Sequence, residues 1–455
     1  MRIAVCVRQS AGGEINPFDA CAYEAALRIP QSEVVLLSMA APRSEEFLRG
    51  LTRLGAKRAV LLSDPAFAGA DTLATAYTLS LAVKRLAPDL VICGRQTVDG
   101  DTGQVGPELS VMTGFSLITN VMELTAEQSY ISCRTRSGET LCAEYPALIT
   151  VERINTLRLP SIRSKTAETE IWSAADLNAD LSRCGLAGSP TKVMKTFENE
   201  QDRRKCRFIE LSELETVVRL SLEKQRIDVK ENQSGKKLKN VWIIGEGPRK
   251  MAQTVSDDIT AVPVADSGKI SELIKEKKPS VILWGSDSQS KTAAAQTAAR
   301  LGLGLCADCT QLETDGSQLF MYRPAFSGNI IAKICSRTVP CMATVRTCEA
   351  DGASVIIGAG MGVRHSLDKI NMLSEKFSAD IVATRLMVDN SYFPYEKQVG
   401  LTGKSISPKV YIAAGISGAV HHIAGIKNSE TVIAINSDRD ASIFKYADYG
   451  IVCKL

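Results

Sequence analysis

Apolar and polar positions alternate in blocks along the first part of the chain. Short aliphatic runs, typical of buried strands, lie at residues 2–7, 33–39, 59–62 and 90–94. Between these runs, apolar residues recur at helical spacing over residues 21–28, 45–54 and 72–86. This alternation predicts a parallel sheet with helices on both of its faces. A strand-rich segment with alternating side chains follows at about residues 121–151.

The strand and helix pattern occurs twice. PDLVICG at Pro88 matches PSVILWG at Pro279, and PALITVE at Pro146 matches PCMATVR at Pro340. The segments between them, TGQVGPELSVMTGFSLITNVMEL and KTAAAQTAARLGLGLCADCTQLE, keep a similar offset. A duplication explains several matched segments better than the general likeness of any two strand–loop–helix units. The second copy looks shortened between residues 241 and 281.

A third α/β unit follows the second copy. Its predicted helix spans residues 366–377, and its predicted strands lie at residues 355–357, 381–383, 410–413, 431–435 and 449–452. Polar, charged residues at 199–206 and 230–239 predict a linker between the copies, on either side of a helix at 211–224. We therefore expect a first domain at 1–190, an arm and linker at 191–236, a second copy at 237–347 and a third domain at 348–455.

Composition narrows the possible classes of protein. A length of 455 residues predicts two or three domains, and the formal net charge of +3 comes without a basic stripe that would indicate nucleic acid. We expect no membrane insertion and no signal peptide, because no apolar run is long enough and the chain opens directly into a strand. Thirteen scattered cysteines then predict reduced thiols in the cytoplasm.

Cys306 and Cys309 form a C-x-x-C motif. No second such pair accompanies them, and all three histidines lie far downstream. Incidental thiols in a turn are therefore favoured over a zinc or redox site, and we expect no metal.

Chemically active side chains gather at the predicted strand ends of the third domain. VYIAAGISGAVHHIAGI runs from a strand through a small-residue turn into a helix, whose first amides suit a phosphate, although tight turns also use glycine for packing alone. Thr384-Arg385, QVGLTGK and Asn436 with Asp438 follow other strands. Strand ends in a doubly wound sheet face one crevice, so these loops predict a single ligand site.

These residues carry a family resemblance. The run TRLMVDN…QVGLTGK…PKVYIAAGISGAVHHIAGIKNSETVIAINSD…ADYGIV, within residues 380–452, resembles the flavin domain of the electron-transfer flavoprotein α subunit. The resemblance implies FAD, with residues 384–385 beside the flavin ring, 399–402 along the flavin, and 417–422 around the ribityl chain and pyrophosphate. It also implies that His422 lies near the pyrimidine carbonyl of the flavin and that Asn436 lies on the adenosine side. The implied cofactor-binding residues are Thr384, Arg385, Gln398, Val399, Gly400, Leu401, Thr402, Ser417, Gly418, Ala419, Val420, His421, His422, Asn436 and Asp438.

Arg385 and His422 are the candidate catalytic residues. A cation or hydrogen-bond donor beside a reduced flavin raises its potential; arginine is always charged, whereas histidine is tunable near neutral pH. Two departures from the family predict weaker FAD affinity. Gly360-Met361-Gly362 replaces the usual Gly-Arg-Gly, so a cation is missing unless Arg364 or Arg337 substitutes, and Lys454-Leu455 stand where the family continues with an acidic residue.

The first copy carries a second candidate site. Its loop GRQTVDGDTGQVG combines glycines that can surround a phosphate with acidic residues that can bind ribose or cap the next helix. With VCVRQ and INPFDACAYEAAL, this loop makes residues 1–228 resemble the β subunit of the same family. The resemblance implies a second nucleotide, AMP or a second FAD, at Cys6, Asn16, Met39, Gly94, Asp99, Gly103, Gln104 and Val105.

The identity of that nucleotide stays open. GDTGQVGPE is closer to the electron-bifurcating branch, whereas the short segment between VRQ and INPFD favours AMP. The corresponding loop of the second copy, GSDSQSKTAAAQ, has lost nearly every glycine, which predicts a structural partner.

The predicted fold is α/β. The resemblance implies two adenine-nucleotide-hydrolase-like parallel-sheet domains, related by a pseudo-twofold duplication, and a C-terminal doubly wound FAD-binding domain, so that one chain replaces the usual heterodimer. The function it implies is an FAD-containing electron carrier for partners such as acyl-CoA dehydrogenase-type flavoproteins. The alternatives are a two-flavin, electron-bifurcating NADH oxidase and a nucleotide-binding regulator without a redox role.

Overall fold

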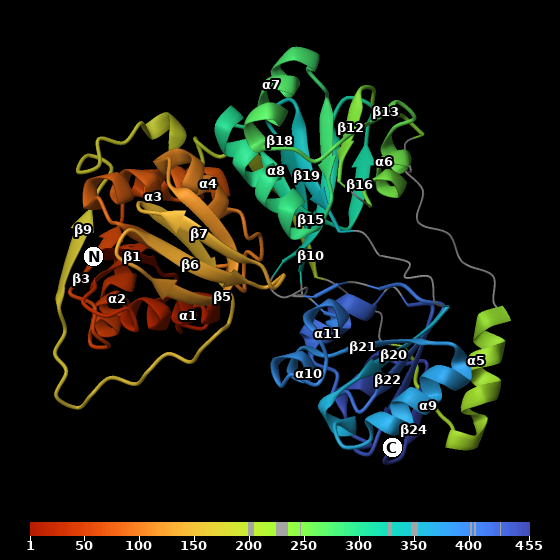
Figure 1. Cartoon of the computed structure of the whole chain (residues 1–455). Coiled ribbons are helices and arrows are strands. Elements are labelled where there is room, and N and C mark those ends of the chain that lie inside the picture. Colours follow the sequence, from red (N-terminus) through yellow and green to blue (C-terminus); the bar gives the residue numbers. More distant parts are fainter. Residues whose placement is uncertain are drawn as a thin grey trace. The chain divides into compact units, whose positions relative to one another are not determined.

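The computed structural model describes residues 1–198, 204–223, 235–245, 247–325, 330–346, 354–400, 403–404, 406–427 and 429–455. The chain divides into two compact units (Figure 1). The first unit, with both copies of the repeat, comprises Met1–Thr196, Asn232–Phe326 and Ala332–Val345; the second, with the third domain, comprises Phe197–Glu231, Ser327–Ile331 and Arg346–Leu455. Within the described residues, no helix combines the length and the apolar character needed to cross a membrane.

The first copy begins with alternating strands and helices, as its apolar pattern predicts. These are β1 (Arg2–Cys6), α1 (Pro17–Leu27), β2 (Glu33–Met39), α2 (Glu45–Thr52), β3 (Arg58–Leu62), α3 (Thr72–Leu86), β4 (Leu90–Gly94) and α4 (Val105–Thr113). They are followed by β5 (Ser116–Ala126), β6 (Tyr130–Thr135), β7 (Thr140–Glu144), β8 (Ala147–Val151), β9 (Glu168–Trp172) and β10 (Thr191–Glu198). Helix α1 starts earlier than predicted, because Pro17 suits the first turn of a helix.

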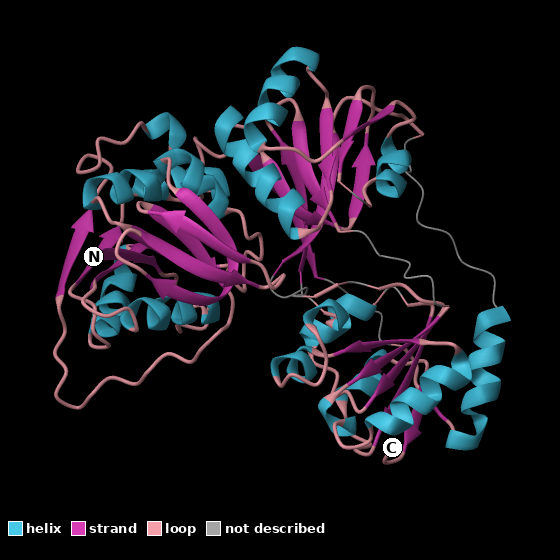
Figure 2. Cartoon of the chain, viewed as in Figure 1, coloured by secondary structure: helices cyan, strands magenta, loops and turns pink. Residues whose placement is uncertain are grey.

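The strands β1 to β9 form one sheet in the order β7-β6-β5-β8-β4-β1-β2-β3-β9. The neighbours from β5 to β9 are parallel, whereas β5, β6 and β7 pair in antiparallel fashion. Helices cover both faces of this sheet (Figure 2), which agrees with strands that are apolar on both sides.

The second copy contains β12 (Val241–Ile244), α6 (Arg249–Val255), β13 (Ile259–Val262), α7 (Ser267–Lys277), β14 (Val281–Trp284), α8 (Ser288–Leu301), β15 (Leu305–Cys309), β16 (Gln311–Thr314), β17 (Leu319–Ala325), β18 (Ile330–Ser336) and β19 (Cys341–Val345). Its parallel sheet has the order β13-β12-β14-β19-β15, and β16 to β18 join β10 in a separate sheet. The order β13-β12-β14-β19-β15 repeats the order β2-β1-β4-β8-β5 of the first copy. The second copy is shorter because fewer elements separate β12 from β14 than separate β1 from β4. The described residues between β12 and β14, which exclude residue 246, form α6, β13 and α7, whereas α1, β2, α2, β3 and α3 lie between β1 and β4.

Two further features show that the copies are equivalent. Helices α4 and α8 end at Gly114 and Gly302, which are both left-handed, with φ of 79° and 66°. Each helix is followed by a strand whose register shifts, between Ile118 and Val121 in β5 and between Cys306 and Cys309 in β15. The motif cysteines thus occupy a bulge whose first-copy equivalents are aliphatic core residues. Both thiols are buried, so they fill the core of the second copy.

The third domain contains β20 (Val355–Ala359), α9 (Leu367–Phe377), β21 (Asp380–Ala383), α10 (Arg385–Asp389), β22 (Val410–Ala414), α11 (Val420–Ile426), β23 (Thr431–Asn436) and β24 (Tyr449–Val452). Its strands are parallel, in the order β24-β23-β22-β20-β21. Strand β20 therefore lies between β21 and β22, and the chain continues to opposite sides of β20. This reversal creates a crevice at the carboxyl ends of β20 and β22.

The chain between the copies adds to the third domain. Strand β11 (Arg207–Phe208) pairs with β24, and α5 (Leu214–Glu223) buries Leu214 and Val218 against the core. The Phe208 and Phe444 ring centroids lie 5.1 Å apart. Arg204, in a segment predicted to be a solvated linker, forms an ion pair with Asp448 and donates to the Ser429 carbonyl. Residues 199–203 and 230–234 of the predicted linker lie outside the described residues.

Candidate functional site

The crevice of the third domain is bordered by the loops that follow β20, β21, β22 and β23. Two of these loops pack directly on one another: a Cβ atom on Gly360 would lie 2.3 Å from the Gly415 carbonyl oxygen, and Gly415 itself has a φ of 62°. Glycine is therefore needed here for loop packing. The case for a ligand rests on the other side chains at this edge.

The predicted flavin-site residues differ in exposure. Those whose side chains or backbones reach solvent are Ser417, Ala419, His421 and Asp438, and those that are half-buried are Thr384, Arg385, Val420 and Asn436. The buried ones are Gln398, Val399, Gly400, Gly418 and His422. Leu401 and Thr402 lie outside the described residues.

Backbone hydrogen bonds bring these segments together. The Val399 amide donates to the Ala383 carbonyl at the end of β21 (3.0 Å). The Asn436 side-chain amide donates to the Ile416 carbonyl (2.9 Å), and the Ile443 amide donates to the Ser417 carbonyl (3.0 Å). The ends of β21, β22 and β23 therefore share one edge, as the doubly wound topology requires.

Arg385 provides a fixed positive charge at this edge. It is the first residue of α10, directly after Thr384, and its Nε lies 3.1 Å from Asp389 Oδ2 one helical turn on. The guanidinium is partly exposed, so a ligand can reach it. Arg364, one of two candidates to replace the missing family cation, donates from Nη1 to the Met361 carbonyl (3.2 Å), within the Gly-Met-Gly turn. The other candidate, Arg337, belongs to the first unit.

His422 is buried and both of its ring nitrogens have partners. Nδ1 lies 3.2 Å from the Val399 carbonyl oxygen, and Nε2 lies 2.8 Å from the Tyr411 hydroxyl. A carbonyl oxygen can only accept, so Nδ1 carries the proton and Tyr411 donates to Nε2. Burial lowers the pKa of His422 to about 4, against an opposing effect of the Val399 carbonyl, so the imidazole is neutral at physiological pH.

The sequence did not single out Tyr411, which is fully buried on β22. The sequence nevertheless indicated a close contact at this point, through a glycine on β20, the strand that pairs with β22. A Cβ atom on Gly358 of β20 would lie 1.7 Å from the Tyr411 hydroxyl, so this glycine makes room for the phenol. Glycine inside a strand often marks such a close approach, and GAG at Gly358 carries that signal.

The second candidate site lies at the carboxyl ends of β1, β2 and β4, where Cys6, Met39 and Gly94 are half-buried. Asn16, which is fully buried, supports the loop from Gly94 to Val105 through two side-chain hydrogen bonds. The Asn16 amide donates to the Gln96 carbonyl (3.0 Å) and its oxygen accepts from the Val98 amide (3.2 Å).

Other predicted residues of this loop also have protein partners. Asp99 forms an ion pair with Arg8 (2.7 Å). Gln104 accepts from the Thr72 hydroxyl (3.0 Å), and Gly103 has a φ of 66°. Contacts within the protein therefore hold several residues of this loop.

Two buried carboxyl groups near this loop were missed in the sequence. Burial raises the pKa of Asp19, which accepts from the Arg8 amide, to about 7. Burial, and next the charge of Asp71, raise the pKa of Glu108 on α4 to about 8. Perturbed carboxyl groups beside a crevice are typical of functional sites. Their burial depends on tertiary packing, so no local pattern reveals it.

The second copy contacts this loop. Arg323 of β17 is buried and donates from Nη2 to the Asp101 carbonyl (3.1 Å), and Gln104 donates from its side-chain Nε2 to the Leu305 carbonyl (3.4 Å). Helices α4 and α8 also pack against each other, with Gln296 donating to the Ser110 hydroxyl (3.5 Å). The second copy, whose own loop has lost nearly every glycine, thus supports the glycine-rich loop of the first copy.

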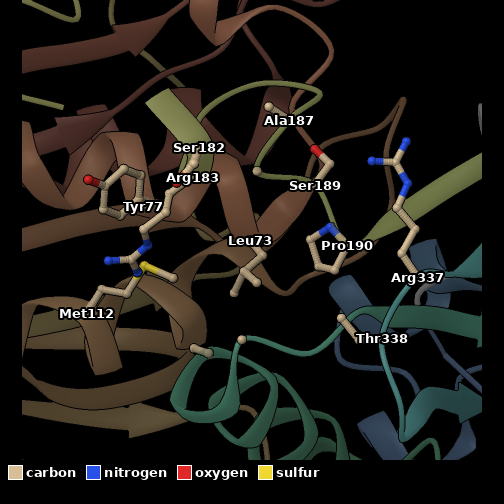
Figure 3. A pocket seen from close by; sticks show the side chains of 13 residues that line it. Leu73, Tyr77, Met112, Ser182, Arg183, Ala187, Ser189, Pro190, Arg337 and Thr338 are labelled. Carbon is tan, nitrogen blue, oxygen red and sulfur yellow. The ribbon is translucent and has the colours of Figure 1, made fainter. Parts of the chain in front are cut away.

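A cavity of about 310 Å³ lies elsewhere in the first unit (Figure 3). Arg183 stacks on Tyr77 at one end, with 4.1 Å from its guanidinium carbon to the ring centroid, and Arg337 lies at the other end. Among the described residues predicted for the flavin and nucleotide sites, Arg337 alone, a candidate replacement for the missing family cation, lines this cavity. Among the described residues, no group of His, Cys, Asp and Glu is arranged to hold a metal ion.

These features define a class of protein. A doubly wound parallel domain places polar loops, a fixed cation and a buried imidazole at one crevice, and a duplicated α/β unit carries a second loop suited to a nucleotide. The residues fit an extended dinucleotide cofactor, because the exposed strand-end side chains and the uncapped start of α11 at Ala419 lie along the same edge.

Comparison with known proteins identifies the family. The electron transfer flavoprotein domain matches residues 3–177 and 255–359, and the electron transfer flavoprotein FAD-binding domain matches residues 349–427. The chain belongs to the electron transfer flavoprotein family. The predicted resemblance and the predicted α/β fold class are both confirmed.

Relatives of both subunits match parts of the chain. Protein FixA of Azorhizobium caulinodans is 40% identical over 227 residues, which cover 46% of this chain and 81% of FixA. The electron transfer flavoprotein subunit alpha of Thermoanaerobacterium thermosaccharolyticum is 38% identical over 40% of this chain and 69% of its own length. The subunit beta of Megasphaera elsdenii is 37% identical over 43% of this chain and 79% of its own length. One polypeptide here combines β-like and α-like regions.

Proposed function

We propose that the chain is an electron carrier that holds one FAD in the third domain and passes electrons between partner redox enzymes. The observation that carries this proposal is the convergence of the β21, β22 and β23 ends on one crevice, in the segment that matches the FAD-binding domain. The boundaries at residues 190, 236 and 347 are proposed as the limits of the β-like domain, the arm and the second copy.

When bound, FAD supplies one-electron and two-electron redox chemistry. The chain supplies the surroundings. Arg385 holds a positive charge at the crevice, and Thr384 begins the helix that presents it. Residues 417–419, with Asn436 behind them, line the part of the edge proposed for the ribityl chain, the pyrophosphate and the adenosine. His422 holds the adjacent loop through the Val399 carbonyl.

A docking site for the partner is proposed on the loop between β8 and β9. Leu159 and Ile162 are 89% and 99% exposed, and they stand between Arg158 and Arg163. The loop runs away from the first copy's sheet (Figure 1). Large exposed apolar side chains mark interaction surfaces, and the exposed Arg163 suits an acidic partner surface, whereas Arg158 is paired with Glu24 (2.9 Å). We propose an acyl-CoA dehydrogenase-type flavoprotein as that partner.

The second nucleotide is proposed to be AMP at the loop from Gly94 to Val105. The side chains of Asn16 and Asp99 already have protein partners, Asn16 in the loop backbone and Asp99 in Arg8, which supports a compact ligand held largely by backbone amides. The alternative is a second FAD, with NADH oxidation and electron bifurcation, and the sequence segment GDTGQVGPE favours it. The described cysteines are free thiols, which supports a reducing compartment such as the cytoplasm.

Extraction of the cofactors from the purified full chain tests these proposals together. One FAD and one AMP per chain is the expected result, with no rapid bleaching by NADH. Two FAD per chain with bleaching by NADH would favour the bifurcating alternative. A chain that binds adenine nucleotide but no flavin, even when FAD is added, would favour the nucleotide-binding regulator.

The Arg385→Ala variant tests the role of the fixed charge. We expect a lower midpoint potential at full FAD occupancy, because the positive charge stabilises the reduced, more negative flavin. Arg439→Ala, which removes an exposed cation from the same domain, is the control. An equal midpoint in the Arg385 variant and the wild type would remove Arg385 from the proposed site.

A further inference from the structure

We propose that Cys6 and Cys93 form a redox-active dithiol at the second candidate site, and that a peroxide oxidises this pair to a disulfide that weakens the binding of adenine nucleotide. The reduced pair leaves the site able to bind. The inference rests on the nucleotide proposed at the loop from Gly94 to Val105, and it adds a modification site that makes its occupancy depend on redox conditions.

The sheet of the first copy places the two thiols side by side. Cys6 and Cys93 are paired residues at the carboxyl ends of β1 and β4, which are parallel neighbours. Both side chains lie on one face of the sheet, in a cluster with core residues of α3 and α4. The two thiols share a hydrogen bond, and this bond, together with burial, raises the pKa of Cys93 well above its usual range.

The two sulfurs differ in their access to solvent. Cys6 is half-buried, whereas Cys93 is 6% exposed. Cys306 and Cys309 of the second copy also share a hydrogen bond, but their exposed fractions are 2% and 0%, so an oxidant reaches neither of them. Cys6 is therefore suited to react first with a dissolved oxidant, and Cys93 is placed to react with the product.

The reaction with a peroxide balances in two steps. The Cys6 thiolate attacks one oxygen of hydrogen peroxide, the O–O bond breaks, and a sulfenic acid forms while the other oxygen leaves as water. The Cys93 sulfur then attacks the sulfenic sulfur, the S–S bond forms, and the hydroxyl group leaves with the Cys93 proton as water. Two thiols and one peroxide thus give one disulfide and two waters, and an added dithiol reverses the change by exchange.

The spacing of the strands permits this bond and gives it a mechanical effect. Neighbouring strands lie about 4.8 Å apart, within the range of about 4.4–6.8 Å between the Cα atoms of a disulfide. The two Cβ atoms of a disulfide are only about 3.8 Å apart, so the bond draws the ends of β1 and β4 together. A disulfide under such strain is easily reduced, which suits a reversible modification in a reducing compartment.

The chain just beyond the two strands holds the nucleotide loop. Arg8, which follows β1, forms an ion pair with Asp99 of the loop (2.7 Å). Gly94 ends β4, and a Cβ atom there would lie 2.4 Å from Asp19 Oδ1, so this point has no room to shift. The Asp19 carboxylate accepts from the amides of both Arg8 and Gly94. Movement of the strand ends should therefore displace the loop amides that are proposed to bind the nucleotide.

Peptide mapping of the full, FAD-loaded chain after treatment with hydrogen peroxide tests the dithiol. We expect a linked pair of peptides that contain Cys6 and Cys93 and that dithiothreitol separates. Cys142→Ser, which removes an exposed thiol from the same sheet, is the control and should leave this link in place. Cys93→Ala should instead leave a sulfenic acid at Cys6, which a sulfenic-acid reagent traps. Unchanged thiols, or sulfinic acid at Cys6 beside a free Cys93 in the wild type, would overturn the inference.

Calorimetric titration of AMP into the nucleotide-free protein, before and after peroxide, tests the effect on the site. We expect the disulfide to weaken AMP binding about tenfold or more, with recovery on reduction and no change in FAD content. Cys6→Ser cannot form the disulfide, so peroxide should not alter its own affinity for AMP.

Equal affinities of the reduced and the disulfide-linked wild type would overturn the proposed effect on the site. A reduced wild type that binds no AMP would refute the proposed nucleotide site itself. The peptide map separates these two failures, because it reports the Cys6–Cys93 bond whether or not a nucleotide binds.

Discussion

The two copies share a sheet order, a helix end and a bulge, yet they differ at the loop that precedes α4 and α8. In the first copy, residues 95–104 separate β4 from a helix α4 of 9 residues. In the second copy, residues 285–287 separate β14 from a helix α8 of 14 residues. Gly100 and Gly103 disfavour helix in the loop of the first copy, whereas the second copy has Ser288 and Lys291 at the equivalent positions, counted back from Gly114 and Gly302. The loss of glycine therefore converts a loop suited to a nucleotide into the first turns of a longer helix.

A second difference lies inside these helices. Counted back from the equivalent glycines at 114 and 302, Glu108 of α4 corresponds to Gln296 of α8. The first copy buries a carboxyl group where the second has its neutral isostere. A carboxyl group with a raised pKa weakens the fold at neutral pH. The first copy, which carries the glycine-rich loop, therefore keeps in Glu108 a side chain that lowers its stability.

The largest effect on stability should come from adding a side chain at Gly94, where the loop begins. A Cβ atom on Gly94 would lie 2.4 Å from Asp19 Oδ1 and 2.7 Å from the Phe18 backbone. We expect Gly94→Ala to destabilise the first unit by about 3 kcal/mol or more and to abolish binding at the proposed second nucleotide site. Urea unfolding measures the loss. Gly12→Ala, where no atom lies within 4 Å of the added Cβ, is the control and should change stability by less than about 0.5 kcal/mol. Equal stability of the two variants would mean that the close approach at Gly94 is wrong.

The second-largest effect is expected for Glu108→Gln, which gives α4 the residue that α8 has at the equivalent position. The pKa of Glu108 is raised from 4.5 to about 8, so the folded chain keeps a proton that the unfolded chain releases between these values. The stability contributed by this carboxyl group is complete below its unfolded pKa and is lost as the pH rises through about 8. We expect the variant to be more stable than the wild type by about 2–4 kcal/mol at pH 9, with little difference near pH 4.

Thermal or urea unfolding across this pH range measures the difference. Glu123→Gln removes an exposed carboxylate whose ion pair with Arg134 spans 3.4 Å, and it should change stability little at any pH. A stability difference for Glu108→Gln that does not depend on pH would show that the carboxyl group is already ionised in the fold.

A smaller effect should follow from Asn16→Ala, which removes both side-chain hydrogen bonds beneath the loop. Each buried bond is worth on the order of 1 kcal/mol, so adenine nucleotide should bind roughly ten to a hundred times more weakly. Flavin content of the third domain should not change. Calorimetric titration of AMP into the nucleotide-free protein gives the affinity. Loss of flavin with unchanged AMP binding would place the second nucleotide somewhere other than this loop.

The smallest effect is expected for Cys309→Val, which gives the second bulge the residue of the first, Val121. Both side chains are fully buried at equivalent points of the register shift, so the exchange should cost less than about 1.5 kcal/mol. Cofactor content and electron transfer should be unchanged. A large loss of either would show that the thiol has a chemical role that its place in the core does not reveal.

The sequence predicted the strands and helices well where burial on both faces leaves a continuous apolar run. The bounds of β2, β4, α3 and β24 agree with the predictions at every residue. Strands β9, β10 and β11 were not predicted, because each lies at a sheet edge or in a polar segment where the apolar pattern is weak. The flavin-site residues stay predictions in their individual roles; among those described, Thr384, Ser417 and Asn436 lie at or just after strands of one domain.

The sequence by itself determined the repeat, the α/β class and the family, and it predicted two cofactor loops, because glycine spacing, apolar periodicity and motifs are local properties of the chain. Tertiary structure decided which groups meet. Tyr411 and His422 belong to successive elements of one motif, yet their hydrogen bond needs the space left by Gly358 on another strand. The raised pKa of Glu108 and the contact of Arg323 with the Asp101 carbonyl likewise depend on distant segments that exclude water. Burial and long-range contact are properties of the folded chain, so these side chains acquire their chemistry only when it folds.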